Sequence, residues 1–294
     1  MNTSPHAHKI LLAVDGSPSA EYAAQYLAAY ARMLGPGMVT ILHVRTPPAG
    51  QPAAAGHSGH EMETVETARN VLKDAGIPFT WRSEPGEPAQ TISRIATEEL
   101  ADEIVMGSRG LGHWKGLVVG SVASRVLQQS DVPVTIVRAA SHVAASIPGP
   151  SRDVHRILLA VDGSRHSVRA TQYVCRLRET GIPLEVELLN VVGPIPPGYL
   201  QEFITQEKLE FYYQQEGAKA LFEARAILES AGVKFSKHIL AGYVMDKLMQ
   251  VAATRNCSRI VMGSRGQGPM AGLMLGSAAY QAVHLSPIPV TLVK

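Results

Sequence analysis

The feature that most constrains the fold of this chain is an internal repeat. The segment Ile10–Ser17 recurs unchanged as Ile157–Ser164, at an offset of 147 positions. A second segment, Ile104–Gly110, recurs unchanged as Ile260–Gly266, at an offset of 156 positions. Solenoid repeats recur every 20–50 residues or so, and a much longer period is typical of duplicated domains. The sequence therefore predicts two copies of one domain in tandem.

The repeat also predicts where the two copies begin and end. We expect a first domain over residues 1–140, a linker over 141–154 and a second domain over 155–294. The linker is rich in Ala and Ser and contains two prolines, a composition typical of an extended connection. Because the offset grows by nine between the repeated segments, the second copy carries nine extra residues, which we place within 192–217. This insertion could cover the second copy's site or an interface, and the sequence leaves its role open.

Each copy alternates short apolar runs with longer segments of helical periodicity. In the first copy the apolar runs predict strands over 10–14, 39–44, 79–83, 103–106 and 134–137. The segments between them predict helices over 19–34, 61–75, 88–100 and 121–129. Nearly continuous apolar strands are typical of parallel strands buried on both faces. We therefore predict an α/β fold, in which each copy forms an open five-stranded parallel sheet with helices on both faces.

Composition and charge exclude several classes of partner. The net charge is +2, from 27 basic and 25 acidic residues, and no concentrated basic run occurs. We therefore expect no nucleic-acid partner. No stretch approaches the roughly 20 apolar residues of a membrane helix, and Met1–Lys9 lacks the apolar core of a signal peptide. With only Cys175 and Cys257 as cysteines, the chain fits a reducing compartment, and we expect a cytoplasmic protein.

Two features fall at the carboxyl ends of predicted strands, where open parallel sheets bind ligands. An aspartate, Asp15 or Asp162, ends the first strand of each copy. A glycine-rich loop follows the fourth strand and leads into the last helix, with the same spacing in both copies. The loop residues are Gly107, Arg109, Gly110, Gly120 and Ser121 in the first copy, and Gly263, Arg265, Gly266, Gly276 and Ser277 in the second.

The chemistry of these residues suits a nucleotide. Glycine lets the backbone approach a ligand closely, and the start of the last helix offers free N–H groups to an anion. Arg109 adds a guanidinium that can hold phosphate oxygens. Asp15 would repel phosphates, so its expected partner is a donor on the base or ribose. Neither GxxxxGK[ST] nor a GxGxxG motif after the first strand is present, which excludes P-loop NTPases and standard dinucleotide-binding domains.

The loop follows a fixed pattern: glycine, two residues, glycine, nine residues and then glycine-serine. Together with an aspartate at the end of the first strand, this pattern resembles the ATP-binding pattern of the universal stress protein family. Both halves match, as in tandem members of that family. The resemblance implies a strand order of 3-2-1-4-5 and pairing of fifth strands across a dimer-like interface between the halves, with further homodimerisation left open. It also implies ATP as ligand, with Mg²⁺ or Mn²⁺ on the phosphates.

The resemblance further implies roles for individual residues. Those expected to contact adenine are Asp15, Val44, Asp162 and Val191. Those expected to hold ribose and phosphates are Gly107, Arg109, Gly110, Gly120, Ser121 and Val122 in the first half, and Gly263, Arg265, Gly266, Gly276, Ser277 and Ala278 in the second. No catalytic residue and no protein metal site is assigned.

Three functions remain open. The leading hypothesis is a nucleotide-dependent regulatory module of the stress response, because no nucleophile or general base recurs in both copies beyond the two aspartates. The alternative is an enzyme of at most weak activity, a slow ATPase or a protein that phosphorylates one of its own serines at Ser108, Ser121, Ser264 or Ser277. An adenylylating enzyme of the PP-loop type is disfavoured, since Asp15-Gly-Ser-Pro18 departs from that family's loop.

The two halves differ inside the glycine loop and in one histidine-containing segment. Trp114 and Lys115 are replaced by Met270 and Ala271 in the second copy. Lys115 would add a charge for a triphosphate, so we hypothesise that the first site binds ATP more tightly. His57 and His60, with the adjacent Glu61, could hold a metal only if a third ligand came near, and a solvated loop is the expected state.

Overall fold

The computed structural model describes residues 7–31, 38–46, 59–110, 119–138, 154–195, 205–267 and 275–294. Strands and helices alternate through both halves. The first half contains β1 (Lys9–Val14), α1 (Pro18–Ala31), β2 (Met38–Arg45), α2 (Gly59–Asp74), β3 (Phe79–Pro85), α3 (Pro88–Glu98), β4 (Glu103–Gly107), α4 (Ser121–Gln129) and β5 (Val134–Val137). The second contains β6 (His155–Ala160), α6 (Arg165–Glu179), β7 (Leu184–Val192), α7 (Gln206–Ser230), β8 (Phe235–Ala241), α8 (Val244–Thr254), β9 (Arg259–Gly263), α9 (Ser277–Leu285) and β10 (Val290–Val293).

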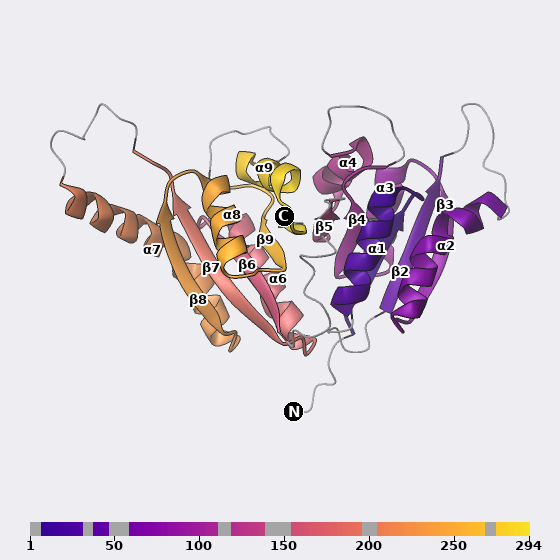
Figure 1. Cartoon of the computed structure of the whole chain (residues 1–294), viewed down its shortest axis with the longest axis horizontal. Helices are drawn as coiled ribbons and strands as arrows, with labels where there is room; N and C mark the ends of the chain where they lie inside the picture. The colour runs from indigo at the N-terminus through magenta and orange to yellow at the C-terminus, as the bar shows by residue number, and fades with distance from the viewer. Residues whose placement is uncertain are drawn as a thin grey trace.

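The strands form one ten-stranded sheet in the order β3-β2-β1-β4-β5-β10-β9-β6-β7-β8. Within each half the pairing is parallel, so the expected order 3-2-1-4-5 is confirmed in both. Figure 1 shows the halves as two lobes, with β5 and β10 between them. The chain's C-terminus lies in the middle of the molecule because β10 is the second half's fifth strand (Figure 1).

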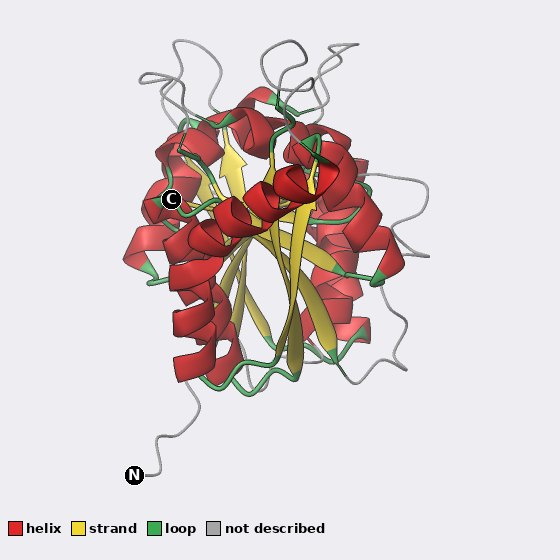
Figure 2. Ribbon diagram, turned by 90° about the vertical axis from the view of Figure 1, so that its left-hand side faces the viewer, coloured by secondary structure: helices red, strands yellow, loops and turns green. Residues whose placement is uncertain are grey.

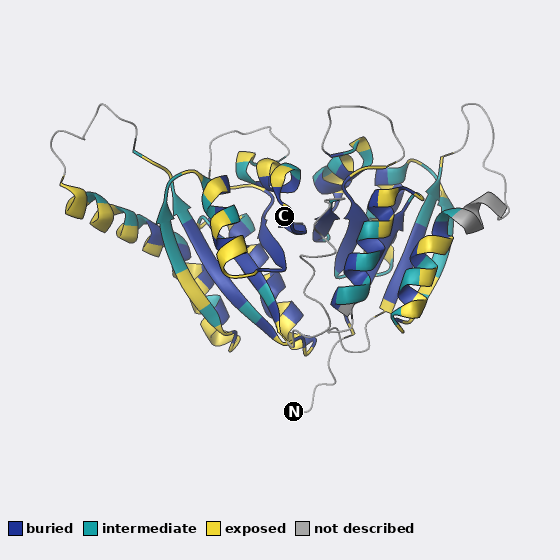
Figure 3. Ribbon diagram, in the orientation of Figure 1, coloured by how far each residue is buried: buried dark blue, intermediate teal, exposed yellow. Residues whose placement is uncertain are grey.

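Helices cover both faces of the sheet, as Figure 2 shows. One apolar core lies under α1, α2, α6 and α7, and a second lies under α3, α4, α8 and α9. In β1, Leu12 faces the first core and Leu11 the second, because successive side chains of a strand point to opposite faces. This double burial explains the continuous apolar runs in the sequence. Figure 3 shows the central strands buried and the outer sides of the helices exposed.

The insertion of the second half lengthens a helix. Helix α7 has 25 residues, whereas its counterpart α2 has 16. The amino-terminal part of α7 extends beyond the sheet (Figure 1), and Phe211 and Tyr212 on it are exposed. Helix α7 as a whole packs on α6, β7 and β8, and no residue of α7 lines the second half's cavity at the strand ends. Helix α7 therefore does not cover that site, and residues 196–204 lie outside the described part.

Strands β5 and β10 join the halves by antiparallel pairing, with Thr135 opposite Thr291. Beside them lies an ion pair between Glu103 and Arg259, both with 0% exposure. Burial alone would raise the pKa of Glu103, but the charge of Arg259 and hydrogen bonds from His8 and Thr135 hold it below its usual range. The carboxylate is therefore ionised at neutral pH and forms a charged pair inside the protein.

Two other expectations concern the chain outside this core. The predicted linker, 141–154, falls outside the described residues except for Val154, so its boundaries stay a prediction. Among the helices of the described ranges, none has the length and apolar character needed to cross a membrane.

We expect the protein to lose stability as the pH falls below about 6.5. His155 is buried against Tyr30, with ring centroids 5.0 Å apart, and its Nδ1 pairs with Ser258 Oγ at 2.8 Å. Burial, aided by the charge of Arg259, lowers the pKa of His155 to about 3. Between these pH values the unfolded chain binds a proton that the folded chain excludes, which favours unfolding.

The expected size of this effect is about 2 kcal/mol between pH 7.5 and pH 5. Urea unfolding of the full chain at both pH values measures it. A His155→Gln variant should lose most of the difference. An unchanged pH dependence in that variant would show that another group is responsible.

Candidate functional site

A tight turn follows the first strand of each half. Asp15 Oδ1 accepts a hydrogen bond from Ser17 N at 3.0 Å, and Asp162 Oδ1 accepts one from Ser164 N at the same distance. The intervening Gly16 has φ +76°, a left-handed conformation that suits glycine. Each aspartate is thereby fixed at the carboxyl end of its strand.

The same turn holds the glycine loop in place. Ser17 Oγ donates to the carbonyl oxygen of Arg109 at 3.2 Å, and Ser164 Oγ donates to that of Arg265 at 3.3 Å. Each of these serines also caps a helix, because Ser17 Oγ accepts from Ala20 N and Ser164 Oγ accepts from Ser167 N. The start of the first helix and the glycine loop of each half are thus fixed by one hydroxyl.

The surroundings of the loop glycines differ in whether they leave room for a side chain. A Cβ on Gly107 would come within 2.6 Å of the backbone of Ser19, so close packing of β4 against α1 forbids a side chain. A Cβ on Gly110 would overlap the carboxylate of Asp15. At Gly120 the nearest atom would be Arg109 Cα at 3.5 Å, an ordinary contact, and φ is −69°. The protein's own packing therefore leaves room for a side chain at Gly120.

Gly120 and Gly276 are the N-cap residues of α4 and α9, and neither makes a side-chain capping hydrogen bond. The first N–H groups of a helix have no partner within the helix, and together they attract anions. By contrast, α3, α6 and α7 are capped by the side chains of Glu87, Ser164 and Thr205. Helix α8, with Tyr243 at its N-cap, also lacks a side-chain capping hydrogen bond. The last helix of each half therefore presents backbone donors at the glycine loop.

A cavity lies at the strand ends of each half. The first has a volume of about 680 Å³ and the second about 300 Å³. Ligand pockets commonly measure roughly 300–1,000 Å³. The structure brings all the predicted residues to these walls. The first cavity is lined by Asp15, Val44, Gly107, Arg109, Gly110, Gly120, Ser121 and Val122, and the second by Asp162, Val191, Gly263, Arg265, Gly266, Gly276, Ser277 and Ala278.

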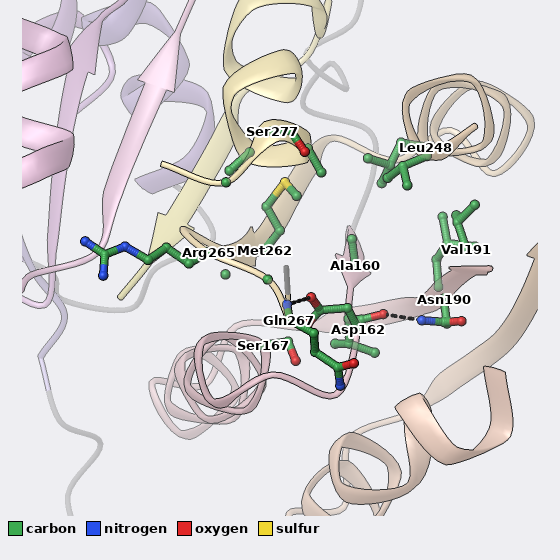
Figure 4. A pocket seen from close by; sticks show the side chains of 18 of the residues that line it. Ala160, Asp162, Ser167, Asn190, Val191, Leu248, Met262, Arg265, Gln267 and Ser277 are labelled. Carbon is green, nitrogen blue, oxygen red and sulfur yellow. Dashed lines mark hydrogen bonds between the residues drawn. The ribbon is translucent and has the colours of Figure 1, made fainter. Parts of the chain in front are cut away.

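Figure 4 shows how the side chains of the second cavity lie. Ser277 faces the cavity from the start of α9, while Val191 and Leu248 form an apolar side opposite the glycine loop. Asp162 Oδ2 accepts a hydrogen bond from Gln267 N at 3.0 Å. The guanidinium of Arg265 extends away from Asp162 (Figure 4). The arginine of the loop is thus on the cavity's rim rather than inside it.

Sequence reasoning missed a second cation beside each glycine loop. Burial lowers the pKa of Arg138, and the charge of Arg109 lowers it further, so these two guanidinium groups lie near one another. Burial likewise lowers the pKa of Lys294, and Arg265 adds to this. The repeat pairs Arg138 with Lys294, and this recurrence of positive charge directly after the fifth strand was the available signal.

The apolar floor of the cavities was also missed. Leu42, Ile92 and Met106 line the first, and Leu189, Leu248 and Met262 line the second. They lie on strands and helices whose apolar pattern indicates only core, so the pattern does not reveal that these side chains also face a cavity.

Other candidate residues are not brought to the cavities. Trp114, Lys115, Met270, Ala271 and His57 lie outside the described residues, as do the side chains of His60 and Glu61. No cluster of three or more His, Cys, Asp or Glu side chains suited to a metal ion occurs in the part of the chain that the structure describes.

Comparisons with a family model and with known sequences agree on one protein family. The model of the universal stress protein family matches residues 6–138 and, again, 153–294. A universal stress protein of Mycobacterium tuberculosis is 26% identical over 311 aligned positions, which cover 98% of this chain and 97% of that protein. One from Thermus aquaticus is 34% identical over 137 positions, covering 44% of this chain and 97% of the relative.

A solved structure shows the same fold. The crystal structure of a universal stress protein from Archaeoglobus fulgidus superposes with a TM-score of 0.64 at 24% identity, and the match covers 98% of this chain and 99% of that one. The tandem arrangement of two α/β halves is therefore shared along the whole length of both chains.

Alanine substitutions at Gly107 and Gly120 should differ in how much they lower the stability of the protein. We expect Gly107→Ala to destabilise the protein by about 1–3 kcal/mol, because the new methyl group must displace the Ser19 backbone. Gly120→Ala should cost at most about 1 kcal/mol, since only the N-cap preference is lost. Urea unfolding of both variants tests this, and equal losses of stability would contradict it.

Proposed function

The chain belongs to the universal stress protein family, and on that premise we propose that each half binds ATP in the cavity at its strand ends. The observation that carries the proposal is the uncapped start of α4 and of α9, which opens onto a cavity lined by the glycine loop. A helix start with unpaired N–H groups favours a phosphate. The open space at Gly120 is then room for the ligand.

The cavity walls support one orientation of the nucleotide. The phosphates would lie over Gly120 and Ser121, where backbone N–H groups and a hydroxyl can donate hydrogen bonds and where Arg109 lines the same cavity. The base would lie among apolar side chains at the other end, beside Asp15 and Val44. Gly276, Ser277, Asp162 and Val191 hold the equivalent places in the second half.

A divalent ion, Mg²⁺ or Mn²⁺, would accompany the triphosphate. Magnesium sites in nucleotide-binding proteins commonly use substrate phosphates, waters and only one or two carboxylates. The described walls of each cavity offer one carboxylate, that of Asp15 or Asp162. The ion would therefore be held mainly by the nucleotide.

We infer a regulatory role rather than a catalytic one. Hydrolysis needs a group that orients or deprotonates the attacking water. The aspartates are the one acidic group that the described walls of both cavities share, and each already accepts a hydrogen bond from its own turn. His43 lines only the first cavity, and its counterpart in the second is Asn190. Slow hydrolysis or self-phosphorylation is the alternative that the assay below separates.

The halves would not bind equally. The first cavity, at about 680 Å³, exceeds the second, at about 300 Å³. This difference in volume supports tighter binding by the first half, which is also the half that carries Lys115 in its loop.

We expect the purified chain to bind ATP with Mg²⁺, and Gly120→Ala to weaken the tighter site on the order of tenfold, since the methyl group takes the place of the phosphates. Gly276→Ala should weaken only the second, looser site. Isothermal titration calorimetry of both variants measures this. Gln129→Ala, at the exposed far end of α4, is the control and should bind as the unmodified chain does.

Two results would contradict the proposal or change it. Absence of nucleotide binding in the folded, unmodified chain would reduce the glycine loops to a structural role. Phosphate release that Gly120→Ala abolishes would establish the slow ATPase instead. Chromatography of nucleotides released from denatured protein gives the occupancy directly, with ATP at about one or two equivalents per chain expected.

A further inference from the structure

The two halves meet around an axis of approximate twofold symmetry. Thr135 pairs with Thr291 across the β5–β10 junction, and the repeat makes these two residues equivalent. Their Oγ1 atoms lie 2.7 Å apart. Groups next to this axis therefore contact their own counterparts from the other half.

Glu103 and Arg259 are also equivalent positions, and they carry opposite charges. Each directly precedes the repeated segment that begins at Ile104 or Ile260, which is unchanged between the halves. Arg259 Nη2 donates to Glu103 Oε1 at 2.5 Å, and both side chains have 0% exposure. The segment that follows these two residues is identical in both halves. Glu103 and Arg259, which contact each other across the axis, instead carry opposite charges.

Both halves supply the groups around this pair. Tyr173 Oη donates to Glu103 Oε2 at 2.7 Å, and Thr135 Oγ1 also donates to Glu103. Arg259 Nε donates to Thr291 Oγ1 at 2.5 Å, and the guanidinium lies over the rings of Tyr30 and Tyr173, at 5.2 and 5.5 Å.

Pairing of two identical halves about the same axis would bury like charges together. Two first halves would place Glu103 against Glu103, and two second halves would place Arg259 against Arg259. A buried charge without a partner of opposite sign is strongly unfavourable. A buried pair, by contrast, is often no more stable than apolar side chains of similar size, so its clearest use is to select partners.

We propose that Glu103 and Arg259 determine which domain each half accepts at its fifth strand. The first half accepts a domain with a cation at the Arg259 position, and the second accepts one with an anion at the Glu103 position. The partner that fits is the opposite half, from the same chain or from a second copy, and identical halves are excluded.

Charge reversal tests this in the full chain. In Glu103→Arg both halves carry arginine at the axis, and in Arg259→Glu both carry glutamate. Each variant alone should melt about 10 °C below the unmodified chain, as breaking a buried pair implies. When the two are unfolded and refolded together, complementary contacts exist only between different chains. Native mass spectrometry should then show a heterodimer of the two variants.

A reversed pair within one chain separates partner selection from simple damage to the core. The double variant Glu103→Arg/Arg259→Glu should keep the oligomeric state of the unmodified chain and recover most of the lost melting temperature. Recovery is expected because three of the neighbours recur about the axis: Thr135 matches Thr291, Tyr26 matches Tyr173, and His8 matches His155. It should be incomplete because Tyr30, whose ring lies under the guanidinium of Arg259, is matched by Leu177.

The outcomes are decisive even if the single variants do not fold alone. Co-expression with two different tags should then yield a soluble heterodimer that neither variant forms with itself. Failure of both the heterodimer and the double variant would overturn the proposal. So would single variants that keep the melting temperature and the oligomeric state of the unmodified chain.

Discussion

The antiparallel pairing of β5 with β10 determines how the two halves are joined and where the edges of the sheet lie. Each of these four-residue strands is buried along its whole length. Without its partner, each would be an exposed apolar edge, the kind of surface that promotes aggregation. Joining them moves the sheet's edges out to β3 and β8, which are only partly buried (Figure 3) and carry charged side chains such as Arg82 and Lys237. The halves therefore depend on one another for solubility as well as position.

The same junction lies close to both cavities. Ser108 N donates to Val137 O, and Ser264 N donates to Val293 O, so each glycine loop begins against a fifth strand. The next residues reach the other half, because Arg138 donates to the carbonyl of Ser286 at 3.3 Å. Lys294 donates to that of Gln128 at 2.6 Å. Arg138 also lies near Arg109, and Lys294 near Arg265, so positive charge gathers where each glycine loop meets the junction.

The fold could be predicted from the sequence because double burial and repetition leave clear marks. Continuous apolar runs such as Ile10–Val14 indicated parallel strands, and the two glycine loops converged on cavities as expected. The charge pair was visible but not recognised. Glu103 and Arg259 differ beside an otherwise unchanged segment, yet their burial depends on the pairing of β5 with β10, which the residues alone do not specify. The lengthening of α7 was not predicted, because nine extra residues can extend a helix or a loop equally well.

Fusion of the two halves explains why such a pair can exist. An interface between identical subunits must be self-complementary, so a residue on the axis meets a copy of itself and cannot be charged without repulsion. In a tandem chain the two positions are encoded separately, and one can become acidic while the other becomes basic. The residues assigned to nucleotide binding, which do not meet across the axis, remain nearly identical between the halves. Beside the repeated segments, the change from Glu103 to Arg259 is a reversal of charge, and it occurs at a position where two identical halves would have repelled each other. The reversal makes each half complementary to the other half and not to a copy of itself.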